Sequence, residues 1–162
     1  IWIGAKKYSS HFIKTRFKLN WGQTYFKMLG ITFDVNLDRI IDLNFKEKIC
    51  TLEKTLKLWK RRYLTPIGKI TVIKSLLQPM FNHLFMAIPN PGEDLVKKIN
   101  DKFYEYLWQG PAKIRKNVVV KQYSEGGLQM INLKCFIQGL KLTWIRRMIN
   151  SEGVWISLTK HV

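Results

Sequence analysis

The sequence predicts a mainly helical protein, α+β overall, in which a helical bundle follows a short β-hairpin or strand region. Three observations lead to this prediction. The spacing of apolar residues changes from strand-like to helical near residue 37, and proline and glycine separate the helical stretches. Hydrophobic residues make up 46% of the 162 residues and aromatic residues 13%. A chain this apolar can bury a core and is not of the disordered class.

Residues 1–33 are expected to be rich in β structure. IWIG at residues 1–4 is a short apolar run that a glycine ends. KLNW at residues 18–21 and YFKMLGITF at residues 25–33 place aromatic and β-branched residues on either side of polar breaks. The basic stretch between them is expected to be a loop. The first segment of the chain is therefore residues 1–35.

A long helix is predicted for residues 37–63, because apolar residues recur there at spacings of three and four. Asp38 and Asp42 stand in its first turns, and cations stand in its last turn, as the helix dipole favours. The apolar positions are Leu37, Ile41, Phe45, Ile49, Leu52, Leu56, Trp59 and Tyr63.

A second helix is predicted for residues 68–86, after a turn at Thr65-Pro66-Ile67-Gly68. Pro79 lies inside this helix, where it removes one backbone hydrogen bond and clashes with the preceding turn. We therefore expect a kink or break near Gln78. A third helix is predicted for residues 93–107, and with it the bundle would span residues 36–110.

The remaining segment, residues 111–162, is expected to be irregular at first and then helical. Residues 113–131 hold a basic run, a β-like VVV triplet and a turn at Gly126-Gly127. Apolar residues at helical spacing then predict a fourth helix over residues 133–149.

The charge of the chain is strongly unbalanced. It has 28 lysines and arginines against 11 acids, a net charge of +17. No acid occurs between Glu53 and Glu93, so the usual pairing of acids with bases along a helix is missing there. Such a chain repels itself and is suited to an acidic partner, with nucleic acid as the first candidate and an anionic membrane surface as the second.

Residues that could carry catalysis or bind a metal are not grouped in the sequence. Cys50 and Cys135 are far apart and form no CxxC pair, and both are expected to be buried thiols in helices. Asp38 and Asp42 share a helix face, but their place at a helix start explains them structurally. We therefore expect that this chain alone catalyses nothing and holds no metal or cofactor.

Several short motifs occur in a characteristic order. FKMLGITF, from Phe26 to Phe33, is followed by a helix end and corner of the pattern W-x-x-R-x-L-T-x-x-G-[RK]-I-x-V-[IV]-K-x-x-x-x-P, then by IP, F and W. EGGLQMINLKCFIQGLKLTWIRR comes last. The matching residues of the middle part are Trp59, Arg62, Leu64, Thr65, Gly68, Lys69, Ile70, Val72, Ile73, Lys74, Pro79, Ile88, Pro89, Phe103 and Trp108.

In this order the motifs resemble the reverse transcriptases of non-LTR retrotransposons, which are of the long interspersed element type. The resemblance implies that residues 1–35 are the end of a polymerase palm, residues 36–110 a thumb-like bundle, and residues 111–162 the start of a connector. The family's catalytic aspartates and their divalent metal, Mg²⁺, would belong to palm motifs upstream of Ile1. The protein would act inside the cell, in the nucleus or the cytoplasm.

The expected function is then to hold an RNA–DNA template–primer duplex for an RNA-directed DNA polymerase, together with the rest of that polymerase and with no membrane partner. Met28, Leu29 and Gly30 would form a hairpin that resembles the primer grip. The expected phosphate contacts are Lys57, Lys60, Arg61, Arg62, Lys69 and Lys74, with Lys113, Arg115 and Lys116 as a second set. The corner's apolar members, Trp59, Tyr63, Leu64, Ile67 and Ile70, would hold two helices together; Trp108 and Trp144 are also expected in the core rather than as stacking surfaces.

Two alternatives remain open at the level of sequence. One is a stand-alone basic module that derives from such an element and binds RNA or DNA without a polymerase. An aspartate pair encoded upstream of Ile1 would favour the polymerase instead. The other alternative is a basic helical protein whose cations lie on anionic lipid.

Overall fold

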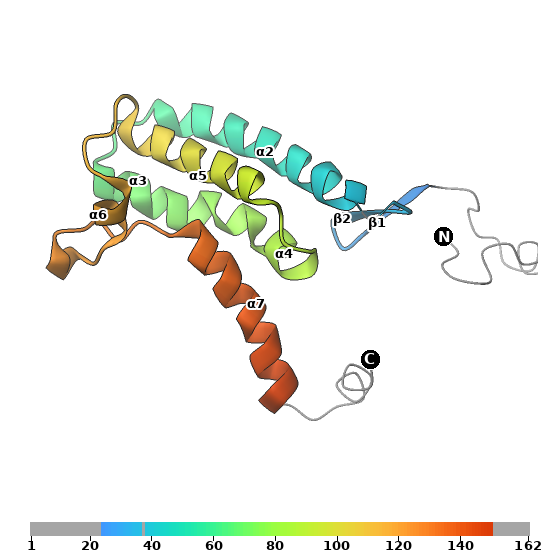
Figure 1. The fold of residues 1–162 in the computed structure, drawn as a ribbon. Helices are drawn as coiled ribbons and strands as arrows, with labels where there is room; N and C mark the ends of the chain where they lie inside the picture. The colour runs from blue at the N-terminus through green and yellow to red at the C-terminus, as the bar shows by residue number, and fades with distance from the viewer. Residues whose placement is uncertain (1–23, 37, 151–162) are drawn as a thin grey trace, which may run out of the picture. The chain divides into compact units, whose positions relative to one another are not determined.

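The computed structural model describes residues 24–36 and 38–150 (Figure 1). Over these residues the protein is mainly helical, and a two-stranded antiparallel sheet precedes the helices, which confirms the predicted fold class. The strands predicted for residues 1–4 and 18–21 lie outside the described residues. The chain separates into two compact units, residues 1–46 and residues 47–162, and the boundary falls within helix α2 (Asp38–Lys60).

The β-hairpin predicted around Gly30 is present in the first unit. Strand β1 (Tyr25–Met28) pairs with strand β2 (Ile31–Asp34), with Phe26 opposite Phe33 and their rings stacked. Leu29 and Gly30 form the two-residue turn with φ values of 50° and 79°. Two successive positive φ values are typical of the type I′ turn, which suits the right-handed twist of a hairpin. Glycine adopts this conformation without strain, whereas leucine rarely does.

A side chain of α2 completes the outer edge of β2. Asn44 is buried, and its Oδ1 accepts a hydrogen bond from the Thr32 backbone N at 2.8 Å. Its Nδ2 donates to the Thr32 carbonyl and to the Ile40 carbonyl, each at 2.8 Å. Both backbone groups of Thr32 are therefore paired as they would be with another strand, because an amide side chain carries the same donor and acceptor as a peptide group.

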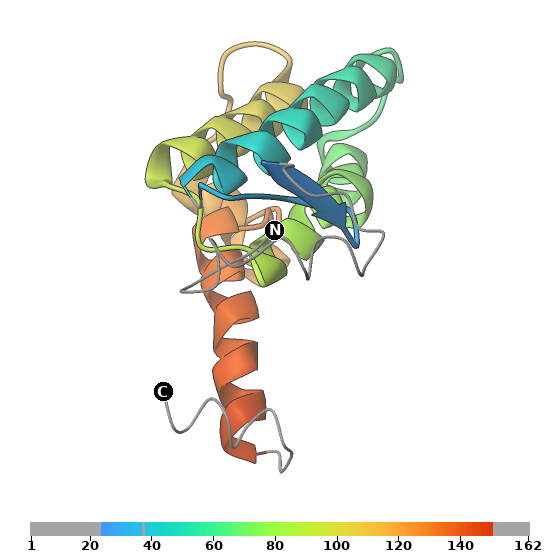
Figure 2. The same ribbon diagram turned by 90° about the vertical axis from the view of Figure 1, so that its right-hand side faces the viewer.

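The second unit is a helical bundle. Figures 1 and 2 show the later part of α2 beside α5 (Glu93–Trp108), with α3 (Pro66–Val72) packed nearby. Residues at helical spacing meet in its core, where burial of apolar surface is the main stabilising contribution. The fully buried side chains include Leu52, Ile70, Ile73, Leu77, Phe81, Leu84, Phe85, Ile99, Phe103 and Leu107.

The irregularity expected near Pro79 takes the form of a widened turn. Between α3 and α4 (Pro79–Ala87), residues Ile73–Leu77 form a single π-helical segment, η2. The Gln78 backbone N donates to the Ile73 carbonyl, five residues back, at 2.8 Å. Pro79 then occupies the first position of α4, where its missing N–H costs no intrahelical hydrogen bond.

The segment after α5 differs from its prediction. Lys116–Val120 forms a short helix, α6, in a stretch that the sequence predicts to be irregular with a β-like VVV triplet. A 3₁₀ turn, η3 (Tyr123–Glu125), and the predicted turn at Gly126 follow. At Gly127 a Cβ would lie 2.1 Å from the Lys121 carbonyl oxygen, so only glycine allows the turn to approach α6 this closely.

The last described helix, α7 (Leu133–Asn150), begins against the bundle and then leaves it (Figure 1). Leu133 and Ile137 are buried, and the Lys141 Nζ donates to the Ile88 carbonyl at 2.6 Å. Burial lowers the pKa of the Lys141 ammonium. No helix among the described residues is both long enough and apolar enough to span a bilayer.

Both cysteines are exposed, so the prediction of two buried thiols is wrong. Cys50 lies on α2 next to the buried Ile49, and Cys135 lies on α7 between the buried positions Leu133 and Ile137, but both side chains are exposed. A helical pattern places residues on one face or another, yet a cysteine beside an apolar stripe need not belong to it.

Candidate nucleic-acid interface

The corner between α2 and α3 is held by backbone and side-chain hydrogen bonds. The Arg62 N donates to the Trp59 carbonyl at 3.1 Å as α2 ends, and the Leu64 N donates to the Arg62 carbonyl at 2.9 Å. Thr65 then caps α3, since its Oγ1 accepts from the Gly68 N at 3.2 Å. The sequence LTPIG thus combines an N-cap threonine with a proline at the first helical position.

The C-terminal ends of α2 and α5 lie close to each other at this corner. The Gln109 Nε2 donates to the Lys60 carbonyl at 3.4 Å, and the Lys60 Nζ forms an ion pair with the Glu105 Oε1 at 2.7 Å. The hydrogen bond and charge of Lys60 lower the pKa of the Glu105 carboxyl. Cations are favourable near helix C-termini, so Lys60 has a structural role in the bundle.

Lys69, predicted to contact phosphate, is withdrawn from the surface. It is only 9% exposed, and its Nζ donates to the Leu107 carbonyl, in the last turn of α5, at 3.2 Å. Burial, and then the charge of Lys113, lower the pKa of this ammonium. Lys69 caps α5 from a neighbouring helix, and we leave it out of the candidate interface.

Arg62 and Lys116 are also engaged within the chain. The Arg62 guanidinium lies 4.5 Å from the centre of the Trp59 ring, and its charge acts on the buried Tyr106 hydroxyl, whose pKa burial raises. The Lys116 Nζ pairs with the Asp101 Oδ1 at 2.8 Å and lies 4.9 Å from the centre of the Tyr104 ring. Both side chains still have N–H donors that a ligand could use, but these contacts within the protein hold them in place.

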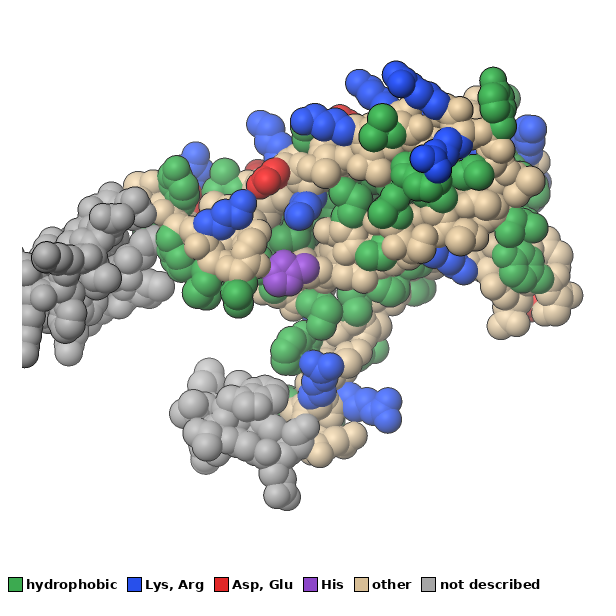
Figure 3. Space-filling view, turned by 180° about the vertical axis from the view of Figure 1, so that it is seen from behind, with side chains coloured by type: hydrophobic (Ala, Val, Ile, Leu, Met, Phe, Trp, Pro, Cys, Tyr) green, Lys and Arg blue, Asp and Glu red, His purple; other side chains and the backbone are tan. Residues whose placement is uncertain are grey.

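Five of the nine predicted phosphate-binding residues have no side-chain ion pair, hydrogen bond or cation–π contact with the described residues, and we name them the unpaired cations. All five are exposed, from the end of α2 to the start of α6. They are Lys57, Arg61, Lys74, Lys113 and Arg115. Figure 3 shows that lysines and arginines greatly outnumber acids on the face it presents, where they stand as separate groups among apolar side chains rather than as one continuous patch.

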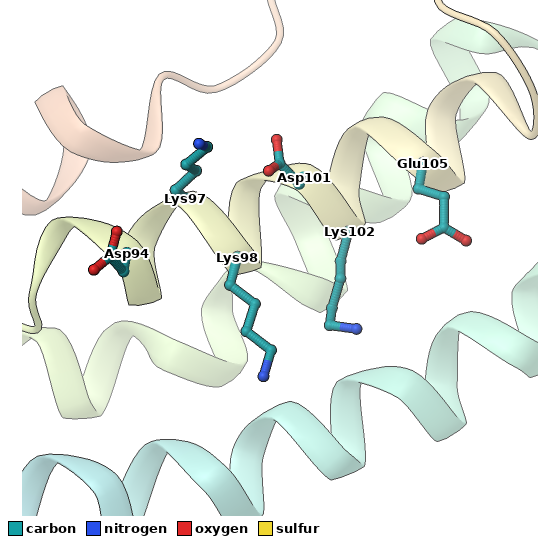
Figure 4. Close-up of a pocket in the computed structure, with 6 residues that line it drawn as sticks. All are labelled: Asp94, Lys97, Lys98, Asp101, Lys102 and Glu105. Atoms are coloured by element: carbon teal, nitrogen blue, oxygen red, sulfur yellow. The ribbon is translucent and has the colours of Figure 1, made fainter.

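The outer surface of α5 is different, because its charges balance. A groove of about 540 Å³ there is lined by three lysines and three acids: Lys97, Lys98, Lys102, Asp94, Asp101 and Glu105. In Figure 4, Lys98 and Lys102 point towards α2, where the Lys102 Nζ pairs with the Glu53 Oε1 at 2.5 Å. The hydrogen bond and charge of Lys102 lower the pKa of Glu53. The positive and negative charges on this surface balance, so it has no excess positive charge to attract a polyanion.

Two aromatic residues expected in the core are exposed instead. Tyr63 is fully exposed and Trp144 is 42% exposed, whereas Trp59 and Trp108 are partly buried. For Tyr63 the reason is that α2 ends at Lys60, three residues before the predicted end, so Tyr63 leaves the register of the apolar stripe. Of the corner's apolar members, Ile70 is buried, Leu64 partly buried and Ile67 exposed.

The primer-grip-like residues form the turn of the hairpin, in the first unit. Met28 and Leu29 expose their side chains, Leu29 to 83%, and Gly30 supplies a positive φ. The next residue, Ile31, pairs with Met28 across the hairpin and is buried.

No protein-family model matches the sequence. Among the described residues, no three histidine, cysteine or acidic side chains come together to hold a metal ion.

Proposed function

We propose that the helical unit holds an RNA–DNA template–primer duplex through its phosphate groups, as the thumb-like part of an RNA-directed DNA polymerase of non-LTR retrotransposon type. The observation that carries this proposal is the set of unpaired cations, exposed side chains that form no ion pair with an acid of the described residues. Phosphoryl transfer would belong to palm residues and Mg²⁺ elsewhere in the parent protein. The order of motifs from Phe26 to Trp108 supports the family.

The chemistry of the unpaired cations suits a backbone contact. Each exposed ammonium or guanidinium that binds a phosphate releases condensed counterions. The affinity therefore falls as the salt concentration rises, and the slope of this fall increases with the number of phosphate contacts. A hybrid duplex is recognised by its shape and its phosphate positions, and such contacts carry no base sequence. Lys57 and Arg61, four residues apart at the end of α2, are the pair we expect to matter most.

The test compares two double variants that remove equal charge. Lys57→Gln with Arg61→Gln removes two unpaired cations, whereas Lys97→Gln with Lys98→Gln removes two lysines from the balanced surface of α5. Affinity for a blunt RNA–DNA hybrid is measured by fluorescence anisotropy over a series of salt concentrations. We expect the first variant to bind more weakly for every sequence and to flatten the salt dependence by about one unit of slope per lost contact. The second should keep the wild-type slope.

Equal effects of the two variants would contradict the proposal, because net charge alone would then explain the attraction. Sedimentation with anionic vesicles serves as a further arm. Binding to those vesicles without binding to the hybrid would favour the membrane alternative instead.

A further inference from the structure

Tyr63 is the most exposed of the described large apolar or aromatic side chains. Its exposed fraction is 107%, so the ring has no packing partner on either face. An isolated exposed aromatic is common on protein surfaces and by itself indicates nothing. The setting of this one is different in two respects: hydrogen bonds hold the backbone that carries it, and an unpaired cation, Arg61, stands two residues before it.

The backbone at Tyr63 is fixed by hydrogen bonds on both sides. The Leu64 N donates to the Arg62 carbonyl, which makes Tyr63 the central residue of a three-residue γ-turn. The end of α2 precedes this turn, and the Thr65 cap of α3 follows it. The ring therefore projects from a rigid support, which lowers the entropy lost when a ligand binds.

The neighbourhood of Tyr63 combines positive charge with exposed apolar surface. Arg61 is exposed and unpaired, Arg62 is anchored on the Trp59 ring, and Ile67 is half exposed at the start of α3. Figure 3 shows hydrophobic side chains beside lysines and arginines at the end of the bundle where α2 joins α3. Tyr123 is 50% exposed in η3, and Lys121 stands two residues before it as Arg61 does before Tyr63, but the residue next to Tyr123 is Gln122 rather than a cation.

We propose that Tyr63 is a stacking platform for an unpaired nucleobase, and that Arg61 binds the phosphate next to that base. Exposed aromatic rings with adjacent cations are how proteins hold single-stranded nucleic acid without reading its sequence. A base pair inside the duplex cannot be the ligand, because its neighbours cover both of its faces. The ligand is therefore a single-stranded extension of RNA or DNA. This inference rests on the proposed binding of nucleic acid and adds a second kind of contact to it.

The test uses one blunt RNA–DNA hybrid and the same hybrid with a short single-stranded extension, of RNA in one arm and of DNA in the other. The wild-type chain should bind at least one extended hybrid about tenfold more tightly than the blunt one. Tyr63→Ala should abolish this difference and leave the affinity for the blunt hybrid unchanged. Tyr63→Trp should preserve it, and Tyr123→Ala is the matched control that should have no effect. Because Tyr63 touches nothing in the fold, its variants should unfold at the wild-type urea midpoint.

An extension with abasic sites separates stacking from charge, since it keeps the phosphates and removes the bases. We expect it to give no advantage over the blunt hybrid. Blunt binding with no gain from either extension would overturn this inference and leave the proposed function standing. So would an advantage that survives Tyr63→Ala or the abasic extension. No binding of any hybrid would overturn both.

Discussion

At the scale of single residues, basic side chains of the same corner have different partners. Lys60 pairs with Glu105, Lys69 caps α5 at Leu107, and Arg61 has neither an acid nor a carbonyl within the described part of the chain. The first two stabilise helix ends, for which cations are suited. Only the third is fully available to a phosphate. The number of basic residues therefore exceeds the number available to bind phosphate, because some of them have partners within the protein.

The ion pair of Lys60 with Glu105 leads to a prediction about acid. The pKa of Glu105 is lowered from an ordinary 4.5 in the folded protein, so the pair contributes stability above that pH and loses it as the pH falls through the lowered pKa. Glu105→Gln should lower the free energy of unfolding at neutral pH by less than about 1 kcal/mol, because both side chains are exposed. Urea unfolding at decreasing pH should show the two proteins becoming equal. A difference that stays constant into acid would assign the effect to packing instead.

The sequence shows the surplus of cations, but it does not tell which of them are exposed and which are held by contacts within the protein. Burial of Lys69 depends on the approach of Leu107 in α5, 38 residues later, and no local pattern reports that contact. The exposure of Tyr63 depends on where α2 stops, and helix ends are the least certain part of a periodic pattern. Lys57, Arg61 and Lys74, for which phosphate contacts are predicted, are exposed because they lie off the apolar stripes.

At the scale of elements, the long helices follow from their own residues. The predicted ranges 37–63, 93–107 and 133–149 correspond to α2 (Asp38–Lys60), α5 (Glu93–Trp108) and α7 (Leu133–Asn150). Their apolar spacing is local information and persists over several turns. The short α6 was missed because three valines favour strands, while its actual support is tertiary: Val119 is buried, and its carbonyl accepts from the Leu128 and Met130 backbone N–H groups.

The hairpin should depend on the side chain of Asn44. Asn44→Ala would leave the Thr32 N–H and carbonyl without their buried partner, at a cost of about 1–3 kcal/mol for each such group. We expect the Thr32 amide to lose its protection in hydrogen exchange, while amides in α5 exchange as in the wild type. Asn82→Ala, which removes a partly buried amide from α4, is the matched control and should leave Thr32 protected. Unchanged exchange at Thr32 in Asn44→Ala would show that the hairpin holds without this contact.

At the scale of the whole molecule, a net charge of +17 opposes the compact state. The four ion pairs found among the described residues involve exposed side chains, apart from the partly buried Lys102, and add little. Raising the salt from about 0.01 M to about 0.15 M shortens the screening length from about 30 Å to about 8 Å, which weakens the repulsion. The melting temperature should therefore rise over this range of sodium chloride, as followed by circular dichroism. A fall would mean that the ion pairs outweigh the repulsion.

The amide of Asn44 also limits how the small sheet can grow. Pairing at Thr32 on the outer side of β2 is already taken by a side chain that belongs to the same polypeptide. Another strand could join that side only by expelling a buried amide, which would cost it three hydrogen bonds. A further strand could thus add only beside β1, and in a larger sheet β2 would remain the edge strand.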